Sequence, residues 1–427
     1  MPGERFIPAR SAAAAETRQQ VACNPALLSL SQAKNVLLLQ GPLGPFFDRL
    51  SLWLRQRGAQ VKRVVFQGGD EHDCRHCEPI AFTQMPTEWM AFFRALLLER
   101  GFDHVVLFGQ ARYYHAVAIR VAQELGVRVV VMEEGYFRPG FATMELDGVN
   151  GYSKTLSRCE WRPEVEPGHA AEWPLHGPIA PQDCEHHFRK MAWHASQHYL
   201  ALRRQASRFP HYIHHKEANP NWYARYWVWS WVKKHWHSPG DRRTQKQLLA
   251  SQQAYFFVAL QHDGDSQITH HSSFSANTNF VIEVMRSFSL HAPTNSLLVF
   301  RQHPHSRGGA GHVRLIRALT RECGIDGRVL HLIEGDTPVL VENSRGVVLI
   351  NSTVGLQALE RHVPLIALGD AHYDQPGLTF QDGLDRFWTE AVPPDPQTNA
   401  HFCAQLKNLT QVPVSLYEMG TAPLVWR

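Results

Sequence analysis

The sequence predicts an α/β protein built around two doubly wound, mostly parallel sheets. Short apolar runs alternate with amphipathic helical patterns, and this alternation occurs once before residue 160 and again after residue 250. Glycine-rich or polar turns follow most of the apolar runs, as is typical where buried parallel strands end. A chain of 427 residues is also too long for one hydrophobic core, so two domains are expected.

The composition is that of a globular, cytoplasmic protein. Hydrophobic residues make up 44% and charged residues 19% of the chain, which excludes a disordered protein. No apolar run reaches about 18 residues, so no transmembrane helix is predicted, and residues 1–33 are expected to be a flexible extension rather than a secretory signal. Seven scattered cysteines favour a reducing compartment. The net charge of +4 is too small for a nucleic-acid binder.

The first domain is expected over residues 34–160. Its predicted strands are 36–39, 61–66, 105–108 and 127–132, and its predicted helices are 46–57, 87–100 and 111–125. Gly41 and Gly44 follow the first strand, and Gly69 and Asp70 follow the second. These glycines either permit only tight turns or let a sugar or phosphate approach the backbone at a helix N-terminus. The fourth strand leads into residues 133–137 (Glu-Glu-Gly-Tyr-Phe), which are expected to form a turn.

Residues 161–250 are expected to form a helical region rich in tryptophan and histidine. Helices are predicted at 184–209 and 221–237, and the second has many aromatic residues and a basic end with Lys233 and Lys234. This composition suits a helix that lies in a membrane interface. The alternatives are a buried inter-domain helix whose tryptophans fill a core, or stacking on single-stranded nucleic acid, which the weak net charge disfavours.

A second alternating unit is expected over residues 251–382. Its predicted strands are 255–260, 297–300, 329–332, 346–350 and 364–368, and its predicted helices are 277–290, 311–322, 337–343 and 355–361. Two Rossmann-like domains that face each other across a central cleft form the architecture called GT-B. Residues 383–427 are expected to form a tail, in which a helix at 398–409 could cross back to the first domain.

Two short motifs have the form of metal sites, but no metal or other cofactor is expected. Cys74 and Cys77 form a C-x-x-C motif without the second ligand pair that a structural zinc site needs. The motif lies in a polar loop, whereas a redox motif should open a helix directly after a strand. Asp263 and Asp265 have the Asp-x-Asp form, yet they follow the first strand of the second domain.

Three polar turns stand at the ends of predicted strands, one in the first domain and two in the second. They are Glu133-Glu134-Gly135, His303-Pro304 and Asn351-Ser352-Thr353. Each has a plain alternative, because adjacent acids can be a solvated pair, a loop histidine can serve a hydrogen bond, and a Ser-Thr pair can cap a helix. Their joint order and placement is more specific than any one of them.

The order of these turns is similar to that in bacterial sialyltransferases with CMP-activated donors. It more closely resembles the KpsS/LipB-type capsule polysaccharide biosynthesis family. The resemblance covers residues 34–380. Its motifs lie at 39–47, 66–70, 133–139, 260–267, 303–304, 351–355 and 373–378.

The resemblance implies a β-Kdo transferase that uses CMP-Kdo as its donor substrate. KpsS-type members are thought to place the first Kdo on a lyso-phosphatidylglycerol acceptor, which starts the lipid-linked oligosaccharide of certain capsules. Related enzymes are taken to be retaining, and the match places the nucleophile at Glu134, with Glu133 as its neighbour. Several relatives have Glu-Asp-Gly at this turn, so attack by Glu134 and deprotonation of the acceptor hydroxyl both stay open.

The remaining site residues follow from the same resemblance and from the chemistry of a phosphate leaving group. The expected donor-binding residues are Gln261, His271, His303, Pro304, Asn351, Ser352 and Thr353, with Arg138 or Arg301 as the cation for the Kdo carboxylate. A cationic His303 could also protonate the leaving phosphate. The expected acceptor-binding residues are Gly41, Gly44, Gly69 and Asp70.

The expected partners are a CMP-sugar, a lipid acceptor at the inner face of the cytoplasmic membrane, a second capsule Kdo transferase and the capsule export machinery. Two other functions stay open. One is a non-catalytic capsule export or assembly factor. The other is a GT-B transferase that uses another CMP-sugar, such as CMP-sialic acid.

Overall fold

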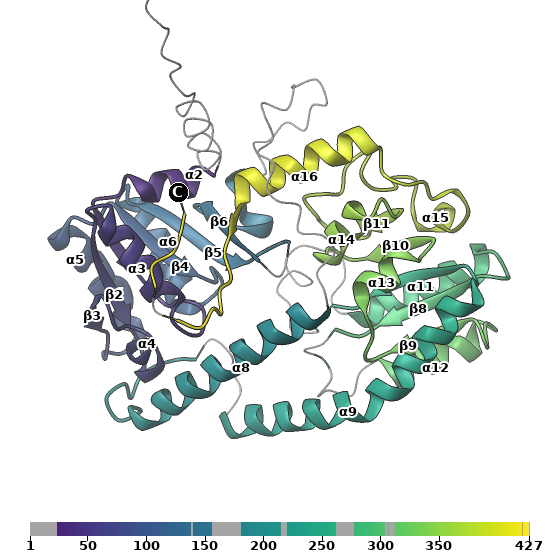
Figure 1. The fold of residues 1–427 in the computed structure, drawn as a ribbon, viewed down its shortest axis with the longest axis horizontal. Coiled ribbons are helices and arrows are strands. Elements are labelled where there is room, and N and C mark those ends of the chain that lie inside the picture. The colour runs from purple at the N-terminus through teal and green to yellow at the C-terminus, as the bar shows by residue number, and fades with distance from the viewer. Residues whose placement is uncertain are drawn as a thin grey trace, which may run out of the picture. The chain divides into compact units, whose positions relative to one another are not determined.

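A computed structural model describes residues 24–137, 140–155, 181–214, 220–261, 277–303, 306, 312–420 and 422–426. These residues form two compact units. The first contains the described residues up to 155, those of 181–214 and those from 404 onward, and the second contains 220–403. Each unit is an α/β structure around its own sheet (Figure 1). This confirms the predicted fold class with two Rossmann-like units.

The sheet of the first unit has seven strands in the order β12-β6-β5-β4-β1-β2-β3. The strands are β1 (Asn35–Leu38), β2 (Gln60–Val65), β3 (Glu78–Ala81), β4 (His104–Phe108), β5 (Arg128–Glu134), β6 (Phe141–Leu146) and β12 (Gln411–Pro413). The five strands β3, β2, β1, β4 and β5 are parallel. At one edge, β6 pairs with β5 in an antiparallel way, and β12 pairs with β6 in the same way.

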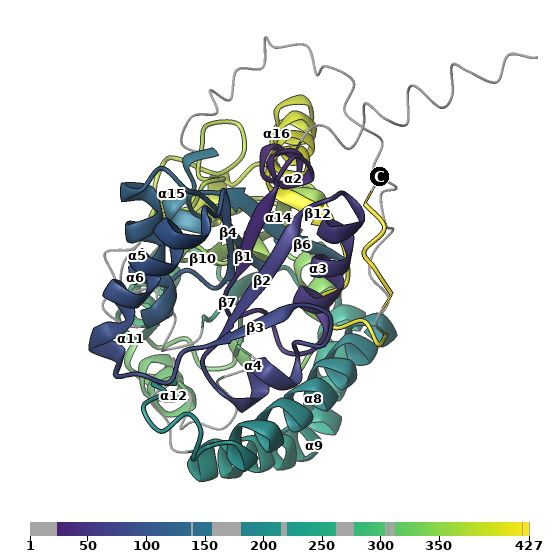
Figure 2. The same ribbon diagram turned by 90° about the vertical axis from the view of Figure 1, so that its left-hand side faces the viewer.

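Side-chain alternation along β1 shows why helices cover both faces of this sheet. Val36 and Leu38 belong to the core cluster on one face, and Leu37 and Leu39 belong to the cluster on the other. The first face packs on α2 (Pro25–Ser31) and α3 (Phe46–Gln56), and the second on α5 (Trp89–Arg100) and α6 (Tyr113–Glu124). Figure 2 shows α3 on one side of the strands and α5 and α6 on the other.

The expected flexible extension over residues 1–33 is wrong for its last part. Residues 25–31 form α2, which is capped by Asn24 and has Pro25 at its first position. Leu27 and Leu30 are buried in the core, and the Asn24 amide donates to the carbonyl of Met144. These contacts hold the segment against the edge of the sheet, and residues 1–23 lie outside the described part of the chain.

Two long helices follow the first sheet in the chain. The predicted helix 184–209 is α8 (Pro181–Arg204), which belongs to the first unit and packs against the short helix α4 (Gly68–His72). The predicted helix 221–237 is α9 (Pro220–Ser251), which belongs to the second unit and continues through Pro239. Sequence favours a stop at this proline. Contacts beyond the proline nevertheless hold the helix in place. The carboxylate of Asp241 accepts hydrogen bonds from the backbone amides of Ile333 and Glu334.

The sheet of the second unit has five parallel strands in the order β11-β10-β7-β8-β9. The strands are β7 (Tyr255–Ala259), β8 (Leu297–Arg301), β9 (Val329–Leu332), β10 (Gly346–Leu349) and β11 (Leu365–Ala367). The helices are α11 (Asn277–His291), α12 (Val313–Glu322), α13 (Thr337–Glu342), α14 (Val354–Glu360) and α15 (Leu384–Glu390). Buried side chains of α11, α12 and α15 form the core on one face of this sheet.

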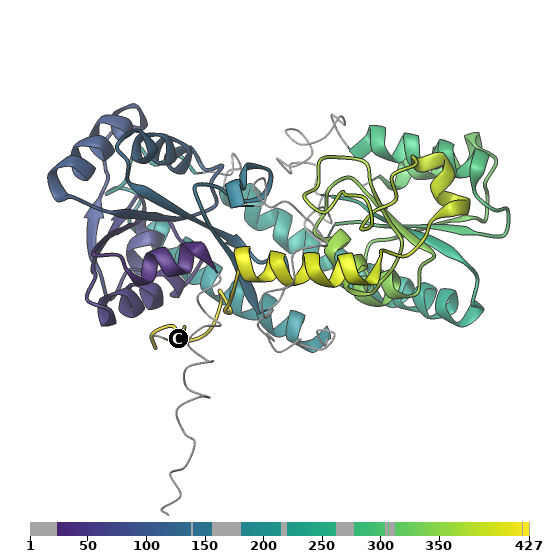
Figure 3. The same cartoon turned by 90° about the horizontal axis from the view of Figure 1, so that it is seen from above.

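The last helix, α16 (Pro396–Thr410), is continuous, and it is yellow in Figure 3. Its residues up to 403 belong to the second unit, and those from 404 belong to the first. The chain then forms β12, which pairs with β6. Among the described helices, none has the length and apolar character that a membrane span requires.

Candidate functional site

Each sheet has one point where its strand order reverses, and ligands of open α/β sheets bind at the carboxyl ends of the strands there. In the first unit this switch point lies between β1 and β4, and in the second it lies between β7 and β10. Polar side chains stand at both points. The two candidate sites are described separately, one for each unit.

Arg112 lies at the switch point of the first unit. It follows β4 through the turn at Gly109, and its Nη1 atom lies 3.5 Å from the carbonyl oxygen of Gly41, which follows β1. Burial lowers the pKa of Arg112, while the nearby Asp70 and Glu133 carboxylates act in the opposite direction. A guanidinium in this position can bind a phosphate or a carboxylate. Sequence reasoning missed Arg112, although its place in the turn after a buried strand was a usable signal.

Asp70, an expected acceptor-binding residue, is only 2% exposed and is held by the protein on both oxygens. Its Oδ2 accepts from the Gln40 amide at 2.9 Å and from the backbone amide of Phe66 at 3.1 Å. Its Oδ1 accepts from the Gln67 amide at 3.2 Å. Gln40 also donates to the hydroxyl of Tyr212 at 3.1 Å. Asp70 therefore fixes the turns after β1 and β2.

The three expected acceptor-binding glycines lie where other side chains approach the backbone closely. A Cβ atom on Gly41 would lie 2.8 Å from the Phe47 ring. Gly44 has a φ of +93°, and a Cβ there would lie 2.6 Å from the ring of His194, while one on Gly69 would lie 2.6 Å from that of His198. Both histidines belong to α8, so these two glycines allow α8 to pack closely on the turns.

The predicted turn over residues 133–137 is wrong in its first half. β5 continues through Glu134, because β6 folds back and pairs with it, with Glu133 opposite Thr143 and Glu134 opposite Ala142. Gly135 is needed at the bend, since a Cβ there would lie 2.2 Å from the carbonyl oxygen of Phe141. Neighbouring residues of a strand point to opposite faces, so the two glutamates do not form one carboxylate pair.

Glu134 is half-buried, and its Oε1 accepts a 2.5 Å hydrogen bond from the hydroxyl of Tyr417. Its Oε2 has no hydrogen-bond partner among the residues described. Nearby, Gln411 accepts from the backbone amide of Tyr136 at 2.8 Å. Sequence reasoning missed Tyr417 and Gln411, because both come from the C-terminal segment and carry no local signal.

At the switch point of the second unit, Gln261 and Asn351 join the ends of β7 and β10. The Gln261 amide donates to Oδ1 of Asn351 at 2.9 Å, and its own oxygen accepts from the Asn351 backbone amide at 3.4 Å. Asn277, at the start of α11, donates to the carbonyl of Gln261 at 2.8 Å. This pairing fixes the start of the predicted Asn351-Ser352-Thr353 turn.

Tyr373 fixes the other side of that turn. Its hydroxyl donates to the carbonyl of Ser352 at 2.5 Å, and a Cβ on Gly355 would lie 2.5 Å from its ring. The Ser352 hydroxyl accepts from the amide of Val354 at 3.3 Å, which agrees with the capping alternative. Thr353 stands at the N-cap of α14, but its side chain makes no capping hydrogen bond.

Two further expected donor-binding residues lie at the carboxyl end of β8, which lies beside β7. His303 stands just beyond its end, and its carbonyl accepts from the amide of Ser306 at 2.9 Å. Arg301 is buried, and its guanidinium donates to the carbonyl of Ile333 at 2.6 Å and to that of Gln302. Three expected donor-binding residues lie outside the described part of the chain, namely Arg138, His271 and Pro304.

The C-x-x-C motif lies in the first unit, after α4. The Sγ atoms of Cys74 and Cys77 are 3.1 Å apart. His76 pairs with the buried Asp48 at 2.5 Å. Among the described residues, no three His, Cys, Asp or Glu side chains are grouped so that they could hold a metal ion.

The fold and these sites define an α/β protein of two Rossmann-like units, each with polar side chains at its switch point. The chain belongs to the capsule polysaccharide biosynthesis protein family, whose model matches residues 103–417. It is 37% identical over 393 residues to the capsule polysaccharide export protein KpsS of Escherichia coli, which covers 92% of this chain and 99% of that protein. It is 33% identical over 403 residues to the capsule polysaccharide modification protein LipB of Neisseria meningitidis, with coverage of 92% and 94%. The family expected from the sequence motifs is thereby confirmed.

Solved structures are similar to this chain at a lower level. The KpsC β-Kdo 2,7 transferase of Thermosulfurimonas dismutans matches 92% of this chain and 95% of its own, with 13% identity and a TM-score of 0.41. HepE of Anabaena in complex with UDP and glucose matches 88% of this chain and 95% of its own, with 10% identity and a TM-score of 0.36.

Proposed function

We propose that this protein is a glycosyltransferase that transfers Kdo from CMP-Kdo to a lyso-phosphatidylglycerol-type lipid. The product would start the linker of a capsular polysaccharide. Membership of the capsule biosynthesis family supports this proposal. The observation that carries it is the hydroxyl-bearing turn 351–353 at the switch point of the second unit, which Gln261 and Tyr373 hold in place.

The proposed donor site uses this turn to bind the phosphate of CMP. Breaking the bond between Kdo and phosphate leaves negative charge on the phosphate oxygens. The hydroxyls of Ser352 and Thr353 can donate to those oxygens without binding a cation first. His303, just beyond the end of the neighbouring strand β8, is the proposed acid for the leaving phosphate. Because Arg301 already donates to two main-chain carbonyls, Arg138 is the better candidate for the Kdo carboxylate.

The proposed nucleophile is Glu134, which lies in the first unit. Tyr417 holds Oε1 of Glu134, which leaves Oε2 to attack the anomeric carbon of Kdo as the bond to CMP breaks. The acceptor hydroxyl then displaces Glu134 and gives its proton to His303, which lost its own proton to the leaving phosphate in the first step. The two displacements together retain the configuration. In the alternative, Oε2 takes the proton from the acceptor hydroxyl directly.

We further propose that α9 lies on the membrane that holds the lipid acceptor. Its exposed side chains Val228, Trp229, Trp231, Val232 and Trp236 recur at intervals of three, four and seven residues, which places them on one face. Lys233 and Lys234 lie on the same helix between Val232 and Trp236, and the Lys233 ammonium lies 5.8 Å from the centre of the Trp229 ring. Tryptophans and basic residues together favour an interface with anionic lipid headgroups.

A second candidate is an export or assembly factor without transferase activity, and the name of the Escherichia coli relative, a capsule polysaccharide export protein, favours it. The two functions differ in one product. Purified protein is incubated with CMP-Kdo and a lyso-phosphatidylglycerol, and the lipid is analysed by mass spectrometry. A lipid heavier by one Kdo supports the proposal. An unmodified lipid with CMP-Kdo, but a modified one with CMP-sialic acid, would assign another donor, and no product with either donor would favour the export factor.

A further inference from the structure

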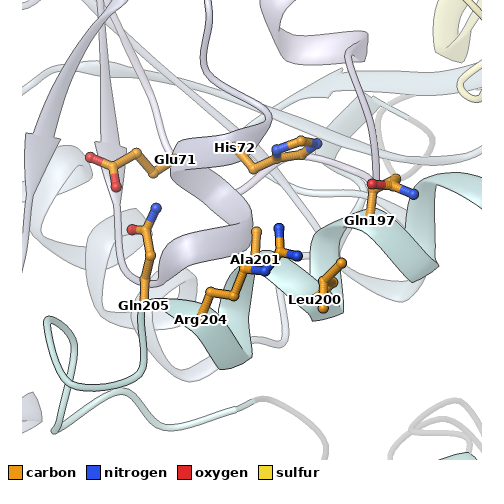
Figure 4. A pocket seen from close by; sticks show the side chains of 7 residues that line it. All are labelled: Glu71, His72, Gln197, Leu200, Ala201, Arg204 and Gln205. Carbon is orange, nitrogen blue, oxygen red and sulfur yellow. The ribbon is translucent and has the colours of Figure 1, made fainter.

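Two adjoining hollows run along α8 within the first unit. The first has a volume of about 260 Å³ and is lined by Glu71, His72, Gln197, Leu200, Ala201, Arg204 and Gln205. The second has a volume of about 250 Å³, and its lining includes Asp48, Asp73, Arg75, Trp193 and His194. His72 and Gln197 line both. We call the two hollows together the α4–α8 groove, and Figure 4 shows the side chains of its first part.

The acidic side chains of the groove already accept hydrogen bonds from the protein. Glu71 accepts from the guanidinium of Arg208 at 2.6 Å. Asp73 pairs with His198 at 2.8 Å and accepts from the amide of Gly44 at 3.2 Å. Asp48 accepts from the backbone amides of Arg75 and His76 and from the His76 ring. These carboxylates therefore repel an incoming anion less than their number suggests.

By contrast, three basic side chains of the groove are unpaired among the residues that the structure describes. Over the described ranges, the side chains of His72, Arg75 and Arg204 make no hydrogen bond or ion pair. Both arginines are exposed, and His72 lies where the two hollows meet. Gln205 adds a buried amide oxygen that has no hydrogen-bond partner in the part of the chain that the structure describes. The groove thus offers cations and a polar acceptor to a ligand.

Apolar side chains stand at the edge of the same groove. Trp193 is 55% and Leu200 is 42% exposed, and each lines one of the hollows. Residues 193, 197, 200 and 204 follow each other at intervals of four, three and four, so they share one face of α8. This face presents an indole, an amide, an isobutyl group and a guanidinium in sequence. An anionic headgroup that is attached to a hydrocarbon chain can use both kinds of side chain.

We infer that the α4–α8 groove binds the phosphate-bearing headgroup of a single-chain anionic lipid. Arg75, Arg204 and His72 contact the phosphate, and Gln205 accepts from a headgroup hydroxyl. Trp193 and Leu200 contact the first part of the acyl chain. The inference rests on the proposed function, because it assigns the recognition site of the proposed lipid acceptor.

Calorimetric titration of the full chain, without any donor, tests this inference. The ligands are a short-chain lyso-phosphatidylglycerol below its micelle concentration, lyso-phosphatidylcholine of the same chain length, glycerol phosphate and inorganic phosphate. We expect lyso-phosphatidylglycerol to bind most tightly, and R75A or R204A to weaken it about tenfold or more. W193A should weaken the lipid but leave glycerol phosphate unchanged.

R189A is the matched control, because Arg189 is an exposed cation of α8 that lines neither hollow. Its affinity for the lipid should equal that of the wild type. Equal losses in R189A and R204A, unchanged affinity in R75A and R204A, or inorganic phosphate binding as tightly as the lipid would each overturn the inference. Since no CMP-Kdo is present, a failure of the proposed transfer reaction leaves this result unaffected.

Discussion

Replacing Gly69 by alanine should loosen α8 from the first unit. The new Cβ atom would lie 2.6 Å from three atoms of the His198 ring. That ring has little room to move, because it is buried and bonds to Asp73 at 2.8 Å and to Gln67 at 2.7 Å. Overpacking of this kind costs about 1–3 kcal/mol. Loss of the two hydrogen bonds adds about 2 kcal/mol, and alanine in a helix returns up to about 1 kcal/mol.

The expected net loss is therefore about 2–4 kcal/mol in the free energy of opening α8. Hydrogen exchange of the α8 backbone amides in native protein measures this quantity. Gly240→Ala is the control, because Gly240 also lies in a helix and, apart from its own stretch of helix, no atom lies within 4 Å of its added Cβ. It should leave the exchange of α8 unchanged. A loss below about 1 kcal/mol in Gly69→Ala would refute the close-packing argument. Weaker acceptor binding without that loss would instead favour ligand approach at Gly69.

Three further predictions concern the donor site, the membrane and pH. Thr353→Ala should lower kcat with CMP-Kdo by about tenfold or more, because it removes a proposed donor to the leaving phosphate, and normal kcat would contradict this role. Replacing Trp229, Trp231 and Trp236 together by serine should weaken binding to anionic vesicles by more than about tenfold in a flotation assay. Unchanged flotation would favour a role of these side chains in packing. Burial lowers the pKa of His115 from 6.5 to about 3. Above pH 6.5 this imidazole is neutral in both the folded and the unfolded protein. At lower pH only the unfolded protein binds the proton, so the free energy of unfolding falls by about 2 kcal/mol between pH 7.5 and pH 5. Urea unfolding of His115→Gln should lack this part of the pH dependence, and an identical pH profile would show that His115 is not the cause.

The parallel strands were predictable because burial on both faces makes them continuous apolar runs. The runs at 36–39 and 105–108 correspond to β1 and β4, and the polar turns after them mark one switch point. The sequence signal failed for β3, β6 and β12. β3 is a short edge strand that contains Pro79 and is largely accessible, so it has no apolar run. β6 and β12 are defined by antiparallel pairing, and β12 pairs with a strand that lies far away in the chain.

The second-unit site was predictable to a greater extent than the first. The residues after the buried strand β10 are Asn351, Ser352 and Thr353, and Gln261 comes after the neighbouring strand β7. The apolar runs predict these strands, and the ends of the strands are where ligands of such sheets bind. In the first unit, Tyr417 meets Glu134 across 283 positions of the chain. No periodicity or spacing encodes such a contact, because it depends on where α16 delivers the C-terminal segment. Arg112 is harder to predict for another reason, because a single arginine in the turn after β4 belongs to no motif.

The transfer reaction of Glu134→Gln tests the account most directly. Glutamine keeps the size of the side chain and an oxygen for the Tyr417 hydrogen bond, but it removes the charge needed for attack or proton transfer. Wild-type protein with CMP-Kdo and lyso-phosphatidylglycerol should yield a lipid heavier by one Kdo, and Glu134→Gln should lower that rate by at least about a hundredfold. Transfer by Glu134→Gln at the wild-type rate would contradict the role of this carboxylate, and no transfer by the wild type would contradict the proposed function.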